Sequence, residues 1–248
     1  MATDFKIDFS KILPIPTLEE FARKQELCLD EVSADNGRKR TQDDWFKYWS
    51  KIKDGRVMAS LGDLYQSFKL IKKMRESGTA EEQATSQNYL DSLRKDFDWP
   101  GKKNWLVSST RLIYSGNSLD ARIIHHYQSN KPELTKEVTL EVPIYHETNI
   151  GDIFNDNKGS VYLQTLLDTE DDAETIISTL EFISGKRRAG ITGYTAGWSQ
   201  ASLSDALKQR GRFPNGAAGF DYDDDEFHIL GSNNIGCPGC SRGVLVTP

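Results

Sequence analysis

The chain has 248 residues, 37% of them hydrophobic and 27% charged, a composition typical of a soluble globular protein. Three cysteines are too few for a disulfide framework, and no apolar run approaches the about 18 residues of a membrane helix. The formal charge of −6 lies mostly in residues 101–248, where 14 basic residues stand against 19 acidic ones. This acidity argues against a nucleic acid partner, and residues 1–10 lack the pattern of a secretory signal.

The first 100 residues have helical patterns. Thr17 and Glu20 form a capping-box signature, which predicts a helix over residues 18–29. Apolar residues at close to helical spacing predict three further helices. These are expected at residues 42–52, 61–76 and 80–97. We therefore expect residues 1–100 to form a helical N-terminal region that buries its apolar side chains in a bundle or a helical cap.

Residues 101–248 show a mixed pattern. Stretches rich in β-branched and aromatic residues predict strands at residues 104–114, 119–127 and 137–145, the first two forming a hairpin. Helices are then expected at residues 159–167 and 171–183, with Gly185 ending the second. A long polar loop with one short helix, residues 203–209, occupies 190–215, and short strands follow at residues 217–222, 226–230 and 244–246. This order predicts an α+β domain rather than a doubly wound sheet, with the hairpin and the C-terminal strands in one sheet.

Cys237 and Cys240 form a CxxC motif in a loop rich in Gly and Pro. Thiolates at this spacing can share a zinc ion or form a redox disulfide. A closed zinc site needs about four ligands, and the chain has no second CxxC. Only folding could bring Cys28 and His228 to such a site. We therefore expect no metal and no cofactor.

Other candidate metal or catalytic groups have simpler interpretations. His125 and His126 are adjacent in a predicted strand, so their side chains should point to opposite faces and share no metal. The acidic residues at 221–226 could chelate calcium, but their spacing differs from the EF-hand loop and fits a solvated hairpin turn. No order of Ser, His and Asp suggests a nucleophile, so we expect no catalytic constellation.

The last 22 residues, from Phe227 to Pro248, have an unusual composition. They contain no Lys, Glu, Gln, Trp or Met, although these five types account for 50 of the 248 residues. The types present are those that an AAY (asparagine) codon can encode when its two adenines are randomised. Small polar and aromatic residues in surface loops also suit an adaptable binding site. This stretch is the candidate binding surface.

This ending resembles that of the variable proteins of diversity-generating retroelements, in particular the archaeal and archaeal-virus branch. Those proteins display diversified residues on a C-type lectin fold related to the formylglycine-generating enzymes. The resemblance covers about residues 104–248 and says nothing about residues 1–100. The segments that carry it are LDARIIHHY (119–127), LLDTEDDAETIISTLEFISG (166–185), AGFDY (218–222), EFHILG (226–231) and SRGVLV (241–246).

The resemblance implies one ligand-facing surface formed by the late loops and strands. Its candidate residues are Thr192, Tyr194, Asp221, His228, Leu230, Ser232, Asn233, Asn234, Ile235, Cys237 and Pro238. Phe220, Phe227 and Ile229 alternate with the strand residues of this set, so the two groups should point to opposite faces of the sheet. We expect these apolar side chains to be buried, the candidate residues to face outward, and Arg242 to be held by hydrogen bonds.

The implied function is non-enzymatic recognition of a protein or glycan ligand, such as a receptor or host surface. The implied setting is a virus particle or cell surface, with residues 1–100 attaching the domain to other components and no membrane insertion. The alternative is an enzyme of the formylglycine-generating type, or a thiol or metal enzyme, that uses Cys237 and Cys240. The GWR-type signatures of the enzyme relatives are not evident, which favours binding.

Overall fold

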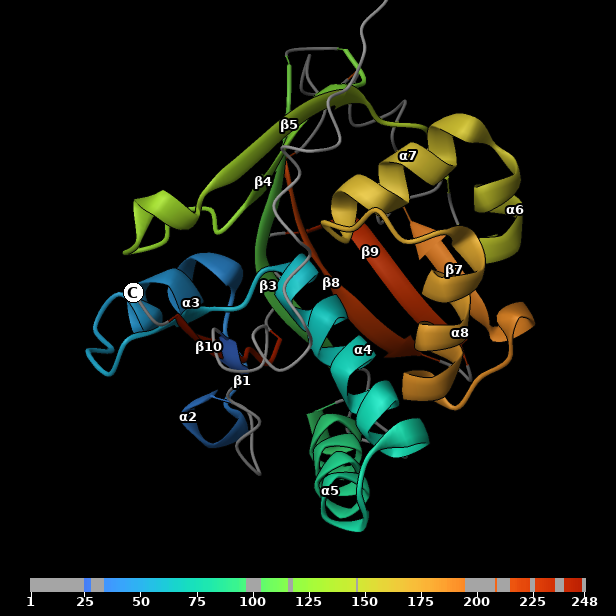
Figure 1. Ribbon diagram of the computed structural model, residues 1–248. Helices are drawn as coiled ribbons and strands as arrows, with labels where there is room; N and C mark the ends of the chain where they lie inside the picture. Colours follow the sequence, from blue (N-terminus) through green and yellow to red (C-terminus); the bar gives the residue numbers. More distant parts are fainter. Residues whose placement is uncertain are drawn as a thin grey trace, which may run out of the picture.

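The computed structural model describes residues 25–27, 34–96, 104–115, 118–145, 147–194, 208, 215–223, 226–234 and 239–246. These residues form a mixed α+β fold, as expected, in which helices lie against a curled seven-stranded sheet (Figure 1). A separate three-stranded sheet lies beside the large one.

The large sheet has the strand order β5-β4-β3-β8-β9-β7-β6. Its strands are β3 (Asn104–Tyr114), β4 (Asp120–His125), β5 (Lys136–Glu141), β6 (Thr148–Asn149), β7 (Ile191–Tyr194), β8 (Gly216–Asp223) and β9 (Glu226–Asn234). All neighbours are antiparallel except β7 and β9, which are parallel. The expected β3–β4 hairpin is confirmed, and β3 joins the C-terminal strands by pairing with β8.

The small sheet joins the two ends of the described chain. It consists of β1 (Gln25–Leu27), β10 (Gly243–Val246) and β2 (Arg56–Met58), with β10 in the centre. The helix expected over residues 18–29 is therefore wrong at Gln25–Leu27, because these residues pair with β10 instead; the rest of that range lies outside the described residues. The final strand expected at 244–246 is confirmed, but it belongs to this sheet and not to the large one.

Five of the expected helices are confirmed within a few residues of their predicted ends. The described helices are α2 (Ala34–Gly37), α3 (Gln42–Trp49), α4 (Leu61–Ser77), α5 (Ala80–Asp96), α6 (Ile150–Asn155), α7 (Asn157–Leu166) and α8 (Ala173–Ser184), with 3-10 turns η2 (Pro132–Leu134) and η3 (Arg188–Gly190). Gly185 ends α8 in the left-handed conformation, φ 68°, as expected. The loop predicted from residue 190 instead begins with β7, and the helix expected over 203–209 lies outside the described residues except at Lys208.

One face of the large sheet carries the main hydrophobic core. Helices α4, α6, α7 and α8 lie over this face (Figure 1). Phe220, Phe227 and Ile229 point into this core and are fully buried, which confirms the prediction for them. The ring of Phe68 from α4 lies 5.0 Å from that of Phe220, which stacks on Phe227 at 5.6 Å. Helix α4 is therefore bound to the C-terminal strands by aromatic packing.

The opposite face of the sheet is partly covered by α3. Trp45, Phe46 and Trp49 of this helix form a second apolar cluster with side chains of β2, β3, β8 and β9. The indole of Trp45 donates to the carbonyl of Gly239 at 2.7 Å, and that of Trp49 donates to the Ser241 hydroxyl at 3.1 Å. These bonds hold the segment that leads into β10.

The packing continues across the boundary expected at residue 100. Val57, Leu64 and Leu93 belong to the same core as the strands of residues 104–244. Strand β2 pairs with β10, and its neighbour Ala59 accepts a hydrogen bond from the backbone N–H of Ser109. Residues on the two sides of the expected boundary therefore contribute to the same main core.

Arg242 also connects the residues on the two sides of this boundary, through buried hydrogen bonds. Its guanidinium donates to the carboxylate of Asp96 and to the Ser92 hydroxyl, the latter at 2.8 Å. All three residues are buried, and Asp96 and Ser92 come from α5. The expectation that hydrogen bonds hold Arg242 is confirmed, and its partners lie in the helical region.

We expect a chain that begins at residue 104 not to fold stably. Its core would lose Phe68 and the other apolar side chains of α4, and Arg242 would lose its buried carboxylate. Limited proteolysis of the full chain should therefore yield no protected fragment beginning near residue 100. A fragment of residues 104–248 with a cooperative thermal transition would contradict this shared core.

A buried hydrogen-bond chain joins four elements near the start of α4. The N–H of Leu61 donates to the Thr110 hydroxyl at 2.9 Å, and that hydroxyl lies 3.0 Å from Nδ1 of His125. Nε2 of His125 lies 3.0 Å from the carbonyl oxygen of Thr165 in α7. A carbonyl oxygen can only accept a hydrogen bond, so Nε2 must donate. The neutral imidazole with its proton on Nε2 satisfies every bond in this chain.

We expect the free energy of unfolding to fall as the pH drops from about 6.5 towards 5. Burial lowers the pKa of His125 below its usual value of 6.5, so the unfolded chain binds a proton that the folded chain excludes. His125 should contribute at most about 1.4 kcal/mol per pH unit to this loss. Urea unfolding at several pH values measures it, and His125→Gln should reduce the slope. If the unfolding free energy of His125→Gln depends on pH as steeply as that of the wild type, His125 does not cause this pH dependence.

Candidate ligand-binding surface

The register of β7, β8 and β9 brings five of the predicted site residues together. Thr192 lies opposite His228, and His228 lies opposite Asp221. One step along the strands, Tyr194 lies opposite Leu230. All five point away from the core face occupied by Phe220, Phe227 and Ile229, because side chains alternate along a strand. The grouping predicted from the sequence is therefore present on the sheet.

Tyr194 is at the centre of this group. Its hydroxyl donates to Oε1 of Glu147 at 2.9 Å, and its ring meets that of His228 edge-on at 5.2 Å. Nε2 of His228 lies 3.5 Å from Oε2 of Glu226, which also accepts a long bond of 3.4 Å from the Thr192 hydroxyl.

The carboxylates around Tyr194 set its protonation. Burial raises the pKa of Tyr194, and the hydrogen bond to Glu147 and the negative charge of that carboxylate raise it further. The phenol therefore stays protonated at neutral pH and acts as a donor. The group offers a ligand the carboxylates of Glu147 and Glu226 and the half-buried ring of Tyr194.

The expected exposure of three of these residues is wrong. Thr192, His228 and Leu230 are only 5%, 7% and 5% exposed. Leu230 packs in the second apolar cluster beneath α3, and the ring of Tyr194 lies against His228. Sequence alternation distinguished the two faces of the sheet but did not show that a helix covers part of the second one. Tyr194 and Asp221 are half-buried, so these two retain accessible surface.

The remaining predicted site residues follow Leu230 in the sequence. Ser232, Asn233 and Asn234 form the end of β9, where Asn233 pairs with Ala217 and Asn234 with Gly216 of β8. The pairing of β7 with β9 ends at Leu230, so among the described strands this end of β9 is hydrogen-bonded on one side only. Ile235, Cys237 and Pro238 lie outside the described residues.

Two residues of the surface were missed by the sequence analysis. Glu226 begins the predicted strand of residues 226–230, where its alternation with His228 and Leu230 could have indicated it. Glu147 reaches the surface because β6 pairs with β7 across more than 40 intervening residues, and β6 is only two residues long. No local pattern could have indicated such a contact.

The candidate metal and thiol groups do not converge in the described part of the chain. Cys240 is 2% exposed in a backbone bridge beside Leu106, and Cys237 lies outside the described residues. His125 and His126 are both buried, because His126 lies past the strand end with φ 52° and points Nε2 to Asp63 at 3.1 Å. No group of three or more His, Cys, Asp or Glu among the described residues could hold a metal ion.

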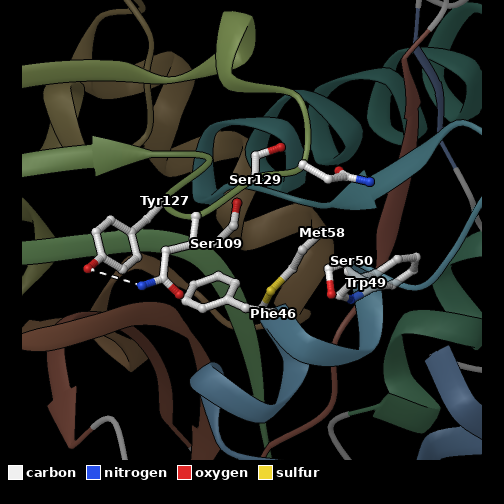
Figure 2. Close-up of a pocket in the computed structure, with 9 residues that line it drawn as sticks. Phe46, Trp49, Ser50, Met58, Ser109, Tyr127 and Ser129 are labelled. Atoms are coloured by element: carbon white, nitrogen blue, oxygen red, sulfur yellow. Dashed lines mark hydrogen bonds between the residues drawn. The ribbon is translucent and has the colours of Figure 1, made fainter.

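A small hollow lies on the α3 side, away from this surface. Figure 2 shows Phe46, Trp49, Met58 and Tyr127 around it, with Ser109 at its wall. Its space of about 230 Å³, part of it open solvent, is below the roughly 300–1,000 Å³ of typical ligand pockets. The Ser109 hydroxyl is buried and has no hydrogen-bond partner. The hollow is therefore a packing feature of α3 and not the candidate site.

Comparisons with protein-family models, curated proteins and solved structures found no match to this chain. Among the described helices, none combines the length and the apolar character needed to cross a bilayer. The geometry of the β7–β9 group is therefore the main evidence about function.

We expect Leu230→Ala to lower the free energy of unfolding by about 2–5 kcal/mol, because Leu230 fills the second apolar cluster. Asn233→Ser, three residues further along the same strand, should change it by less than about 0.5 kcal/mol. Thermal or urea unfolding of both variants makes the comparison. A loss for Asn233→Ser as large as that for Leu230→Ala would show that the end of β9 is structural.

Proposed function

We propose that this chain is a non-enzymatic binding protein that displays hypervariable residues on a C-type lectin scaffold, diversified by a retroelement. The proposed ligand-facing residues are those at the end of β9 and in the segment up to Pro238, together with Tyr194 and Asp221 of the sheet. The ligand is a protein or glycan on a receptor or host surface. An archaeal cell or an archaeal virus particle is the proposed setting.

One observation carries this proposal, namely the way in which β9 is held. Its backbone pairs with β8 from Glu226 to Asn234, so the strand is supported independently of its side chains. Phe227 and Ile229 anchor its first half in the core, whereas Asn233 and Asn234 lie beyond the end of the β7 pairing. A strand whose first half is anchored in the core, and whose end is paired only with β8 among the described strands, suits a scaffold that accepts many residues at one end.

The helical region supports the proposed attachment to other components. Helix α5 extends away from the large sheet (Figure 1), and its charged residues Glu81, Glu82, Asp91 and Arg94 are exposed. Its other side packs on α4 through Leu90 and Leu93. We propose the exposed side of α5 as the attachment surface to virion or cell-surface components.

The enzymatic alternative depends on the CxxC motif. A thiol enzyme requires its cysteines beside a cleft that admits substrate. Cys240 is buried, and it is not among the residues that line the hollow beside α3. The binding function therefore has the better support.

The decisive experiment is sequencing of this gene across the population that carries it. Substitutions should concentrate in the codons of residues 232–238 and should replace adenines, with a near-identical template repeat and a reverse transcriptase gene nearby. The codons of Phe220, Phe227 and Arg242 should remain constant, because their side chains are buried in the core or hold α5. Equal substitution rates in the two sets of codons would contradict the proposal.

A further inference from the structure

Two buried hydrogen-bond donors lie without an acceptor beside Gly239. They are Nε1 of Trp105 and Nε of Arg40, and among the described residues no acceptor lies within hydrogen-bond distance of either. A buried donor that has lost its water and gained no partner is costly, so native proteins leave few of them. Two such donors at one glycine indicate that an acceptor from outside the chain binds there.

The indole of Trp105 lies across β3 between two glycines. A Cβ atom at Gly219 would lie 2.8 Å from Cε3 of this ring, and a Cβ atom at Gly239 would lie 2.7 Å from its Nε1. The ring can occupy this place because neither glycine has a side chain. Its N–H edge is therefore on the Gly239 side, and Trp105 is only 5% exposed.

Arg40 lies on the other side of Gly239. The two residues exchange both backbone hydrogen bonds, at 3.0 and 2.8 Å, so their side-chain positions share one face. The guanidinium lies over the rings of Trp45 and Tyr48 at 5.4 and 5.5 Å, and its Nη2 donates to Asp35. This ion pair leaves Nε unsatisfied. The Arg40 side chain is 24% exposed, so the site is open to solvent on this side.

The charge around this site is positive once the ion pairs within the chain are counted. The acids of residues 34–47 are each paired with a base, as Asp35 is with Arg40. By contrast, Arg38 and Lys39 are exposed, and no acidic side chain in the described part of the chain pairs with them. Donors favour an anionic acceptor over a neutral one, because a hydrogen bond to an ionised group is stronger.

We infer that a carboxylate of the ligand binds beside Gly239, where its oxygens accept from Nε of Arg40 and Nε1 of Trp105. Trp105 pairs with Asp221 of β8, so this site continues the candidate surface across β3. The inference rests on the proposed binding function, because the carboxylate belongs to the ligand. It does not require residues 232–238 to be variable.

The test follows the indole and arginine Nε–H signals of the ¹⁵N-labelled full chain by NMR during titration with sodium acetate. Acetamide is the neutral probe of the same shape, and sodium chloride keeps the ionic strength constant. Acetate should shift the signals of Trp105 and Arg40 saturably, and acetamide should bind at least about tenfold more weakly, because it lacks the charge. Equal affinity for the two probes, or no saturable shift of either signal, would overturn the inference.

Two conservative variants each remove one donor, and the signal of the other donor reports binding. Arg40→Lys keeps the positive charge, and Trp105→Phe keeps an aromatic ring. Each should weaken acetate binding about tenfold, the loss expected for one hydrogen bond to a charged group. Arg38→Gln is the control, because it removes a nearby exposed charge but no donor beside Gly239, and it should change the affinity less than about twofold. If Arg38→Gln weakens binding as much as Arg40→Lys, net charge alone attracts acetate and the inference fails.

Two larger probes distinguish the sources of a ligand carboxylate. N-acetylaspartate N-methylamide represents an acidic side chain of a protein, and glucuronate represents an acidic glycan. The probe that binds more tightly than acetate identifies the class of ligand. The two proposals fail separately, since constant codons at residues 232–238 would contradict diversification and leave this site in place. A chain that does not bind acetate would remove this site and leave diversification untouched.

Discussion

The arrangement of the helices on the sheet depends on the hydrogen bonds of the Thr110 hydroxyl. It accepts from the first N–H of α4 and lies within hydrogen-bond distance of His125, whose other nitrogen reaches the end of α7. One side chain of β3 thus links α4 to the sheet directly and α7 to it through His125 of β4. The neighbouring Asp63 carboxylate accepts from both the N–H and the hydroxyl of Ser60 while Nε2 of His126 lies beside it. The hydrogen bonds of Thr110, His125 and Asp63 favour a single arrangement, because a shift of α4 or α7 would leave buried polar groups unpaired.

Helix α3 holds the C-terminal segment against the second face of the sheet. Helix α3 is tied to β3 by Gln42, whose amide donates to the carbonyls of Ser108 and Thr110 at 2.7 and 3.0 Å. Its tryptophans hold Gly239 and Ser241 on the path to β10. The C-terminal segment is therefore anchored before and after residues 235–238, by β9 on one side and by α3 on the other.

Much of the secondary structure was predictable from local patterns. Helices α3, α4, α5, α7 and α8 and strands β3, β4, β8 and β9 follow from spacing, caps and alternation. The placement of Phe220 and Phe227 on the face opposite to Asp221 and His228 was also predictable, since period-two alternation is a local property. Strands β1, β2 and β7 were not, because each has only three or four residues and exists through pairing with a distant strand. Within the candidate surface, the grouping of Tyr194 with His228 was predicted, but the partner carboxylate of Glu147 was not.

The sequence by itself determined which side chains share a face of each helix and strand, because that depends only on the period of the element. It also determined the unusual composition after Phe227, which first indicated a binding surface there. The tertiary structure decided what lies against each face. Leu230 alternates like an exposed residue, yet it is buried in the second apolar cluster, and Val138 alternates like a core residue, yet it lies exposed at the sheet edge. Which element covers a face depends on contacts between residues far apart in the chain, and these contacts leave no periodic signal.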